Sequence, residues 1–336
     1  MSTRAFSRKN RVYAMREFIL LHYGTYLNPS NHSQSDEPKA IILDVAGGKG
    51  VLSWLFCNMD GYDSIVIDPR RTDYSNLMKS VTYLLTNPKE AEERCQPHLP
   101  TFQPLAACLK QKMCKDSQLH PFVPVLPRHL RIYVDDALIQ TIDSMLLESI
   151  VTSSFAFEVA CDENQNQNEN ENRNWEIFIE KAIQKSESTC PIYGKHQYTK
   201  TEPQKSTLES NTIVNPNEAY KIFQMTKLIV GFHPDQATEA CIDLALLLKI
   251  PFVVCPCCVF PSEFPNRFLH DTIYSDNNDN EIDNDDNDDF GIHVRTYTQL
   301  IQYLQRKHPK IRTERIDMKS DTARNIVLYM MPEDFM

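Results

Sequence analysis

Residues 44–50 form a short glycine turn of the kind that brings a ligand close to the backbone. The turn, Asp-Val-Ala-Gly-Gly-Lys-Gly, follows the apolar run 40–45 and precedes a segment whose apolar residues have helical spacing. Glycine lacks a Cβ atom, and the start of a helix supplies N–H groups that have no partner within the helix. A strand, a glycine turn and a helix in this order predict a nucleotide-type site at the carboxyl end of the strand.

Two phosphate-binding patterns do not fit this turn. A dinucleotide turn requires a third glycine, but the register that begins at Gly48 and passes through Gly50 has Ser53 in the last position. A P-loop requires a glycine five residues before its Gly-Lys pair and a Ser or Thr after that pair, whereas this chain has Leu43 and Gly50 there. The sequence therefore disfavours both of these ligand classes.

An acid followed by spaced glycines is the third pattern, and the turn fits it. Asp44 supplies the acid, and Gly47, Gly48 and Gly50 supply glycines, with Ala46 where the pattern usually has its first glycine. The turn is similar in this respect to that of methyltransferases, whose cofactor S-adenosylmethionine carries a cationic ammonium and sulfonium but no phosphate. A carboxylate suits such a cation, so these five residues are expected to bind that cofactor.

Acids also follow the next two expected strands. Asp68 and Pro69 come at the end of the second strand, 24 residues after Asp44, where a carboxylate can accept both ribose hydroxyls. Asp135 and Asp136 follow the third strand, where the adenine would lie. Each acid alone could equally cap a helix, but acids at three consecutive strand ends favour a shared adenosine site.

The methyl-acceptor side is expected at the end of the apolar strand 227–231. His233 follows this strand and could act as a general base for a hydroxyl group or a ring nitrogen. Asp235 could orient His233, or it could cap the helix that begins there. Both residues are expected catalytic groups, and capping stays the open alternative for Asp235.

Cysteines cluster after the strand 251–255. Cys257 and Cys258 end the run Cys-Pro-Cys-Cys and are expected to line the substrate side with small, soft side chains. Arg267 ends the segment 261–267, which could cover the substrate as a lid. A zinc site would need a second, separated set of ligands, so no metal is expected.

Apolar spacing predicts alternating helices and strands along the chain. The expected helices are 9–27, the segment after the glycine turn, 73–84, 137–150, 235–249 and 297–307. The expected strands are 40–45, 64–68, 130–134, 227–231, 251–255, 311–317 and 324–331.

The last two expected strands follow one another without a helix between them, which predicts a hairpin. The expected fold class is therefore α/β: a Rossmann-like, seven-stranded, mostly parallel sheet with a C-terminal antiparallel hairpin, plus insertions. This arrangement is similar to the class I methyltransferase fold. A dinucleotide dehydrogenase would instead continue with strand, helix and strand.

The chain has 336 residues and 41% hydrophobic residues, which predicts a single domain over 1–336 with an N-terminal helical segment, 1–38. Two polar low-complexity tracts, 161–173 and 275–289, are expected to be disordered. They hold twelve acids, so the net charge of −10 leaves the rest of the chain close to neutral and does not exclude a nucleic-acid partner. The expected interruptions of the domain are an insertion at 86–128, a partly disordered insertion at 161–215 and a disordered acidic loop at 275–290.

Three stretches together resemble one branch of the class I S-adenosylmethionine-dependent methyltransferases. They are the cofactor turn 44–50, His-Pro-Asp-Gln-Ala-Thr-Glu at 233–239 and Cys-Pro-Cys-Cys at 255–258. The chain resembles there the acceptor-stem tRNA 2′-O-methyltransferases and the methyltransferase-like proteins related to them. The resemblance implies methyl transfer from S-adenosylmethionine, with RNA (tRNA or rRNA) as the acceptor.

Two other functions stay open: a non-catalytic adenosine-binding scaffold on the same fold, and an NAD(P)-dependent oxidoreductase. Basic residues at 4–16 and 306–315 offer phosphate contacts to RNA, although each could equally lie on a solvated helix face. No apolar run is long enough to cross a membrane, so no membrane partner is expected. Ten cysteines without a secretory signal favour the cytoplasm or the nucleus, with a mitochondrial presequence in the basic first 24 residues as the alternative.

Overall fold

The structure is a computed structural model of the whole chain. It describes residues 3–28, 40–72, 125–155, 164–190, 211–269, 291–318 and 324–336. The expected helix 73–84, the acidic loop 275–290 and most of the insertion 86–128 lie outside these residues. None of the helices in the described ranges is long and apolar enough to cross a membrane.

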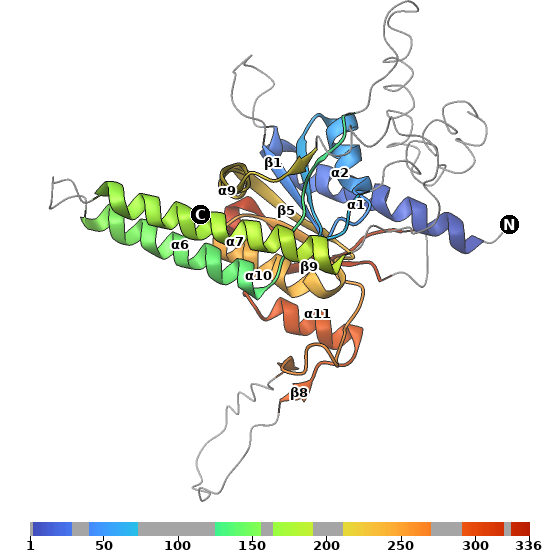
Figure 1. Cartoon of the computed structure of the whole chain (residues 1–336). Helices are drawn as coiled ribbons and strands as arrows, with labels where there is room; N and C mark the ends of the chain where they lie inside the picture. The colour runs from blue at the N-terminus through green and yellow to red at the C-terminus, as the bar shows by residue number, and fades with distance from the viewer. Residues whose placement is uncertain are drawn as a thin grey trace, which may run out of the picture.

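The main helices and strands alternate along the chain, as the sequence predicts (Figure 1). The helices are α1 (Thr3–Leu27), α2 (Val51–Leu55), the π-helical turn η1 (Phe56–Asp60), α6 (Asp136–Phe155), α7 (Asn164–Thr189), α9 (Pro216–Met225), the 3₁₀ turn η4 (Asp235–Ala237), α10 (Thr238–Leu248), α11 (Tyr297–Gln305) and the 3₁₀ turn η5 (Pro332–Phe335). The strands are β1 (Ile41–Val45), β2 (Asp63–Ile67), β3 (Arg128–Leu130), β4 (Thr212–Ile213), β5 (Thr226–Phe232), β6 (Phe252–Cys255), β7 (Phe268–Leu269), β8 (Ile292–His293), β9 (Arg312–Arg315) and β10 (Ile326–Met330).

The main sheet has the strand order β4-β3-β2-β1-β5-β6-β10-β9. The strands from β4 to β6 are parallel, and β10 is antiparallel to both β6 and β9. The expected α/β class, the mostly parallel sheet and the C-terminal antiparallel hairpin are therefore confirmed. The last strand, β10, lies between β6 and β9, so the hairpin closes this end of the sheet.

The expected count of seven strands is wrong, because the sheet has eight. The additional strand, β4, is only two residues long and too short to produce an apolar pattern. The third strand is also displaced: β3 covers Arg128–Leu130 instead of the expected 130–134. It pairs with the last three residues of β2, and beyond Leu130 no β2 residue is left to pair. Ile132 and Val134 are apolar because they are buried beyond the strand end.

The prediction of a disordered tract at 161–173 is wrong for residues 164–173, which form the start of α7. Gln and Glu are good helix formers, and adding residues to an existing helix costs much less than starting one. The existing helix is fixed further along, where Trp175 and Ile179 are buried in the core. Figure 1 shows α7 running beside α6, so the inserted segment extends the helical layer.

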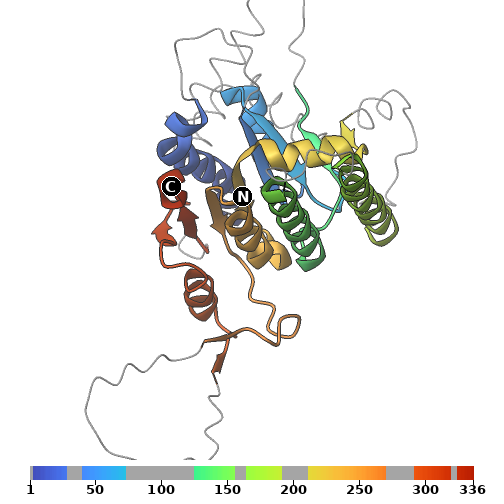
Figure 2. The same cartoon turned by 90° about the vertical axis from the view of Figure 1, so that its left-hand side faces the viewer.

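Helices cover both faces of the sheet (Figures 1 and 2), and each face has its own apolar core. Alternate residues of one strand enter opposite cores: Leu43 packs with α6, α9 and α10, whereas its neighbour Ile42 packs with α1 and α2. Side chains of a strand alternate between the two faces of a sheet, so a strand covered on both faces is apolar throughout. This explains the uninterrupted apolar runs that the sequence shows in β1, β5 and β6.

Tyr23 fastens α1 to the point where the sheet changes from parallel to antiparallel. Its hydroxyl is buried and lies 2.9 Å from the carbonyl oxygen of Met330 in β10 and 3.2 Å from that of Phe252 in β6. These two residues are partners in the antiparallel ladder. The N-terminal helix is thus held to the C-terminal hairpin.

Replacing Tyr23 by Phe should lower the free energy of unfolding by about 1–2 kcal/mol, because buried carbonyl oxygens lose their hydroxyl partner. The matched change Tyr26→Phe, at a half-buried position on the same helix, should stay within about 0.5 kcal/mol of the parent. Urea denaturation followed by circular dichroism measures both values. Equal losses in the two variants would contradict the assigned role of Tyr23.

Candidate functional site

A cavity of about 810 Å³ lies at the carboxyl ends of the parallel strands. Because β1, β2, β3 and β5 are parallel, the residues that follow them meet at one edge of the sheet. The chain proceeds from β1 toward β3 on one side and from β5 toward β6 on the other, and ligands of open α/β sheets bind at such a reversal. The predicted site residues that line the cavity are Ala46, Asp68, Pro69, Asp135, Asp136, Asp235 and Arg267.

The glycine turn adopts a backbone that few residue types tolerate. Ala46, Gly48 and Gly50 have φ values of 52°, 56° and 65°, in the left-handed region that glycine enters without steric cost. Gly47 is required for a different reason: a Cβ atom there would lie 2.6 Å from the Asp44 Oδ2 atom. The turn is therefore wrapped closely around the Asp44 carboxylate.

Asp44 is buried beneath the turn, with only 1% of its surface exposed. It accepts a hydrogen bond of 2.8 Å from the Ser53 hydroxyl, which in turn accepts one of 3.0 Å from Ser64. Burial raises the pKa of Asp44 to about 7, and the nearby charge of Asp68 acts in the same direction. The carboxylate lies within the loop and is not among the residues that line the cavity, so it affects the cavity through the shape of the turn.

Asp68 is fully buried and both of its oxygens are occupied. Oδ2 accepts hydrogen bonds of 2.9 Å from the Gly48 amide and from the Arg70 guanidinium. Oδ1 accepts hydrogen bonds from the amide of Arg70 and from its Nε atom. The carboxylate expected to receive ribose hydroxyls therefore binds Arg70 and the glycine turn.

Pro69 and the two acids after β3 complete this side of the cavity. The Pro69 carbonyl accepts a hydrogen bond of 3.1 Å from Arg131. Asp135 accepts one from the Leu138 amide at the start of α6, and its other oxygen lies 3.4 Å from Lys185 of α7. Asp135 thus caps a helix and faces the cavity at the same time, so the two roles considered for it do not exclude each other.

His233 follows β5 and is not itself among the residues that line the cavity, but the next two residues, Pro234 and Asp235, are. It has a φ of 56°, and its Nε2 atom is buried without a hydrogen-bond partner among the described residues. Burial lowers the pKa of His233 to about 4, and the positive charges of Arg11 and Arg324 contribute. Its ring is therefore neutral near pH 7, with a nitrogen available to accept a proton.

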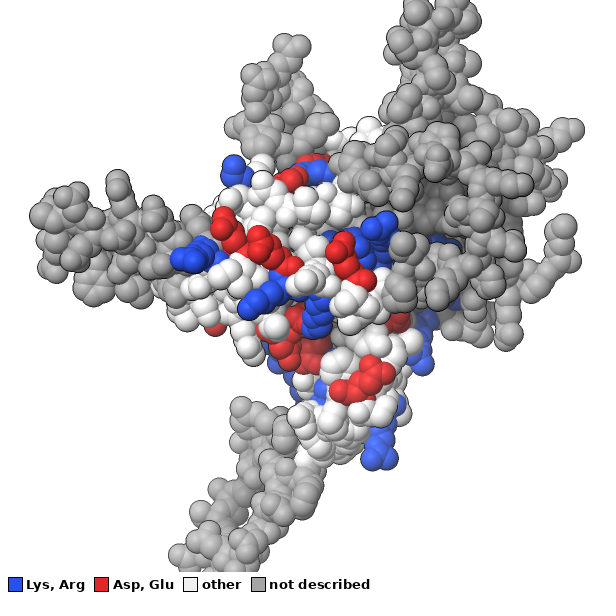
Figure 3. Space-filling view, viewed as in Figure 1, with Lys and Arg blue, Asp and Glu red and all other residues white. Residues whose placement is uncertain are grey.

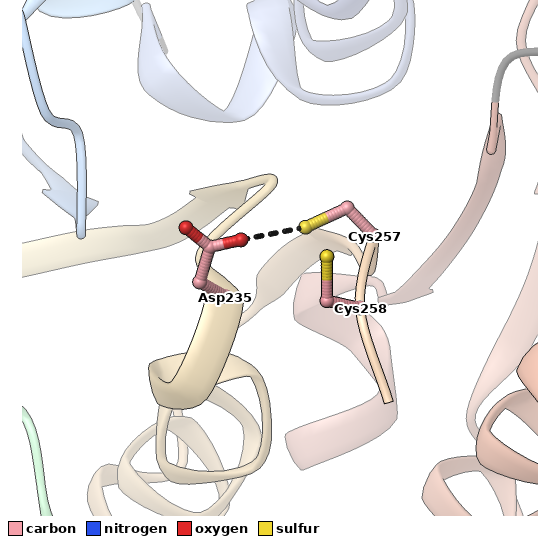
Figure 4. A group of neighbouring side chains, drawn as sticks. All are labelled: Asp235, Cys257 and Cys258. Atoms are coloured by element: carbon pink, nitrogen blue, oxygen red, sulfur yellow. Dashed lines mark hydrogen bonds between the residues drawn. The ribbon is translucent and has the colours of Figure 1, made fainter. Parts of the chain in front are cut away.

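Asp235 contacts the cysteine run instead of His233. Its Oδ1 atom accepts a hydrogen bond of 3.0 Å from the Sγ atom of Cys257. Cys258 lies beside them, and Figure 4 shows the three side chains pointing toward one another. Burial raises the pKa of the Cys257 thiol above its usual range. The expected pairing of Asp235 with His233 does not occur among the hydrogen bonds of the described residues.

Arg267 is buried and holds the segment after β6 in place. Its Nε atom donates to Glu239 at 2.6 Å, and its guanidinium stacks on the Phe264 ring with 3.6 Å to the ring centroid. Glu239 also binds Tyr303 and Lys307 of the C-terminal region. The contacts of Arg267 are those of a residue that anchors the wall of the cavity.

Three residues of the site were missed by the sequence reasoning. Arg70 follows an acid and a proline at a strand end, and only the folded turn brings its guanidinium back onto Asp68. Ser53 stands where the dinucleotide pattern requires a glycine, and in the structure its hydroxyl donates a hydrogen bond to Asp44. Glu239 lies at the start of α10. It is the last acid of the His-Pro-Asp-Gln-Ala-Thr-Glu stretch, and that position is the sequence signal by which it could have been found.

Several basic residues expected to contact phosphates are paired within the chain. Arg16 binds Asp60, Lys307 binds Glu239 and Asp243, and Arg312 binds Asp334. On the face shown in Figure 3, acidic and basic side chains of the described residues are interspersed.

No family model, curated protein or solved structure matches the chain.

Replacing Gly47 by Ala should move the Asp44 carboxylate and destabilise the protein by about 1–3 kcal/mol, the usual cost of overpacking. The matched change Gly24→Ala, in α1, should raise stability by up to about 1 kcal/mol, because nothing lies within 4 Å of the added methyl group. Thermal unfolding followed by circular dichroism distinguishes the two directions. A Gly47→Ala protein as stable as the parent would contradict the close packing of the turn on Asp44.

Replacing Asp44 by Asn should change how stability depends on pH. A carboxyl group whose pKa is raised on folding contributes stability that is fully present below its unfolded pKa, near 3.8, and is lost as the pH rises through 7. The parent should therefore lose stability relative to Asp44→Asn between about pH 4 and 7, by on the order of a few kcal/mol. Urea denaturation of both proteins across this pH range tests the difference, and parallel curves would show that Asp44 is not the titrating group.

Proposed function

We propose that the protein is an S-adenosylmethionine-dependent methyltransferase whose acceptor is RNA. One observation carries the proposal: the cavity at the ends of β1, β2 and β3 is lined by seven carboxylates and two arginines, and the buried carboxylate of Asp44 lies directly under its glycine turn. A cavity of this composition suits a ligand with positive charge. S-adenosylmethionine combines such a charge with an adenosine.

The hydrogen bonds of the turn also argue against a phosphate ligand. A phosphate cradle needs backbone N–H groups that point at the ligand. Here the amide of Ala46 donates to Ile67, that of Gly48 to Asp68 and that of Gly50 to Gly47. Three amides that could have received a phosphate therefore already have acceptors within the chain.

The adenosine half of the ligand can use Asp68 once Arg70 moves. A carboxylate offers about four acceptor positions, and hydrogen bonds from the glycine turn and Arg70 occupy all four. The Arg70 side chain is 38% exposed, so its guanidinium is not part of the buried core. Two ribose hydroxyls would then replace the two guanidinium hydrogen bonds, while the backbone amides keep the carboxylate in position.

The sheet supports the same class of function. The resemblance to class I methyltransferases implies a parallel sheet that ends in an antiparallel hairpin, and β9 and β10 form such a hairpin. A dinucleotide dehydrogenase would continue with parallel strands and helices at this point. The C-terminal topology therefore favours a methyltransferase over the oxidoreductase alternative.

The acceptor side is assigned to His233 as general base. The lowered pKa keeps the imidazole neutral near pH 7, which is the form a general base requires, and its Nε2 atom is buried without a hydrogen-bond partner among the described residues. Arg11 and Arg324 act electrostatically on the same ring, and guanidinium groups are preferred phosphate ligands. In RNA a ribose hydroxyl lies next to a phosphodiester, so the hydroxyl could contact His233 while the phosphodiester contacts Arg11 and Arg324. This favours RNA as the methyl acceptor.

Calorimetry with S-adenosylmethionine, S-adenosylhomocysteine and NAD⁺ tests the cofactor. The parent should bind the first two and not the third, and Asp68→Asn should weaken binding at least about tenfold, because an amide cannot accept both hydroxyls. The control is Asp63→Asn, at the opposite end of β2. A folded protein without affinity for S-adenosylmethionine would refute the proposal, and binding of NAD⁺ would favour the oxidoreductase.

Transfer of a labelled methyl group to total RNA and to total protein tests the reaction. Label should enter RNA, and His233→Ala should bind cofactor normally but lose at least about a hundredfold in rate, as expected for a general base. His308→Ala, in the connection between α11 and β9, serves as the control. Cofactor binding without transfer to either pool would favour a non-catalytic adenosine-binding protein, and full activity of His233→Ala would remove the base.

A further inference from the structure

Two thiols and a carboxylate meet beside the cavity in an arrangement that the sequence does not reveal. One ligand atom from each of Asp235, Cys257 and Cys258 lies within 4.8 Å of the other two. Asp235 belongs to the turn after β5 and the cysteines to the segment after β6, and Figure 4 shows all three directed into one space.

The parallel pairing of β5 with β6 fixes the two segments. Phe232 is aligned with Cys255, and the His233 amide donates to the Cys255 carbonyl at 3.0 Å. Asp235 and Cys257 follow these paired positions by only two or three residues. The ligand atoms are therefore positioned by the hydrogen bonds of the central sheet, and rigid elements are what a metal site needs for constant geometry.

We propose that Asp235, Cys257 and Cys258 form a zinc site. Thiolate ligands select zinc and other thiophilic ions, whereas magnesium and calcium prefer sites made of oxygen atoms alone. Cys257 donates a hydrogen bond to Asp235, and the zinc ion would lie between these two groups. It would displace the thiol proton of Cys257 and bind both the sulfur and the carboxylate oxygen. On binding, the two thiols release their protons to solvent and the carboxylate contributes one oxygen.

Three protein ligands leave the fourth tetrahedral position of zinc open, which is the pattern of reactive zinc sites and not of structural ones. Asp235 also lines the cavity, so the proposed zinc site adjoins it. A water molecule or an atom of the acceptor can occupy the open position. This site does not depend on the identity of the cofactor, so it can be tested separately from the proposed function.

Cobalt substitution of the reduced full-length protein is the direct test. After chelation and dialysis, one equivalent of Co²⁺ should give a sulfur-to-cobalt charge-transfer band and the visible absorption of a tetrahedral ion, and one equivalent of Zn²⁺ should abolish both. X-ray absorption of the zinc form should show two sulfur neighbours at about 2.3 Å. Calorimetry with S-adenosylmethionine on the same preparations keeps this result separate from that of the cofactor test.

Variants identify the ligands among the ten cysteines of the chain. Cys257→Ser and Cys258→Ser should each lose the charge-transfer band, whereas Cys57→Ser, which removes a thiol on the opposite side of β1, should keep it. Asp235→Asn retains both thiols and should weaken zinc binding at least about tenfold. Circular dichroism checks that each variant is folded. Stoichiometric metal in the Cys257→Ser, Cys258→Ser double variant, or no metal bound by the reduced parent, would overturn the proposal.

Discussion

The hydrogen bonding of β1 on both of its edges is the constraint on which the rest of the structure depends. Residues Ile41–Val45 pair in parallel with β2 on one side and with β5 on the other. This pairing places the carboxyl ends of three strands at one edge of the sheet, and the turns that follow these strands lie at that edge. The glycine turn, Asp68 and the segment of His233 converge there because their strands are aligned, although they lie up to about 190 residues apart in the sequence. The same alignment continues into β6, which brings the cysteine run to the turn after β5.

Unfavourable features of the chain are concentrated at this edge. Asp44 and Asp68 are buried carboxylates, and Ala46, His233 and Asp235 adopt left-handed backbone conformations that cost free energy for residues other than glycine. Burial of apolar side chains in the cores on the two faces of the sheet stabilises the fold and offsets these costs. Perturbed pKa values and backbone strain cluster at functional sites in general, so their coincidence with the cavity supports the choice of site independently of any resemblance.

The two sides of the cavity differ in how their polar groups are satisfied. On the proposed cofactor side, Asp68 is saturated with hydrogen bonds from Arg70 and the glycine turn, so a nucleoside would have to replace some of them. On the proposed acceptor side, a buried nitrogen of His233 has no hydrogen-bond partner among the described residues, and Asp235 accepts a hydrogen bond from Cys257. The first arrangement suits reversible binding of a nucleoside. The second suits chemistry, because an unsatisfied group in a buried setting gains most from a substrate or an ion.

The sequence by itself determined the α/β class, the terminal hairpin and the glycine turn around Asp44, because these depend on local spacing of apolar residues and glycines. It could not determine β4, the true ends of β3 or the helical state of residues 164–173, since these depend on which neighbour is available for pairing or packing. Nor could it show that Arg70 occupies Asp68, or that Asp235 lies against Cys257 and not against His233. Such contacts join residues whose side chains are oriented by strand register and by the turns that follow, and only the tertiary structure decides them.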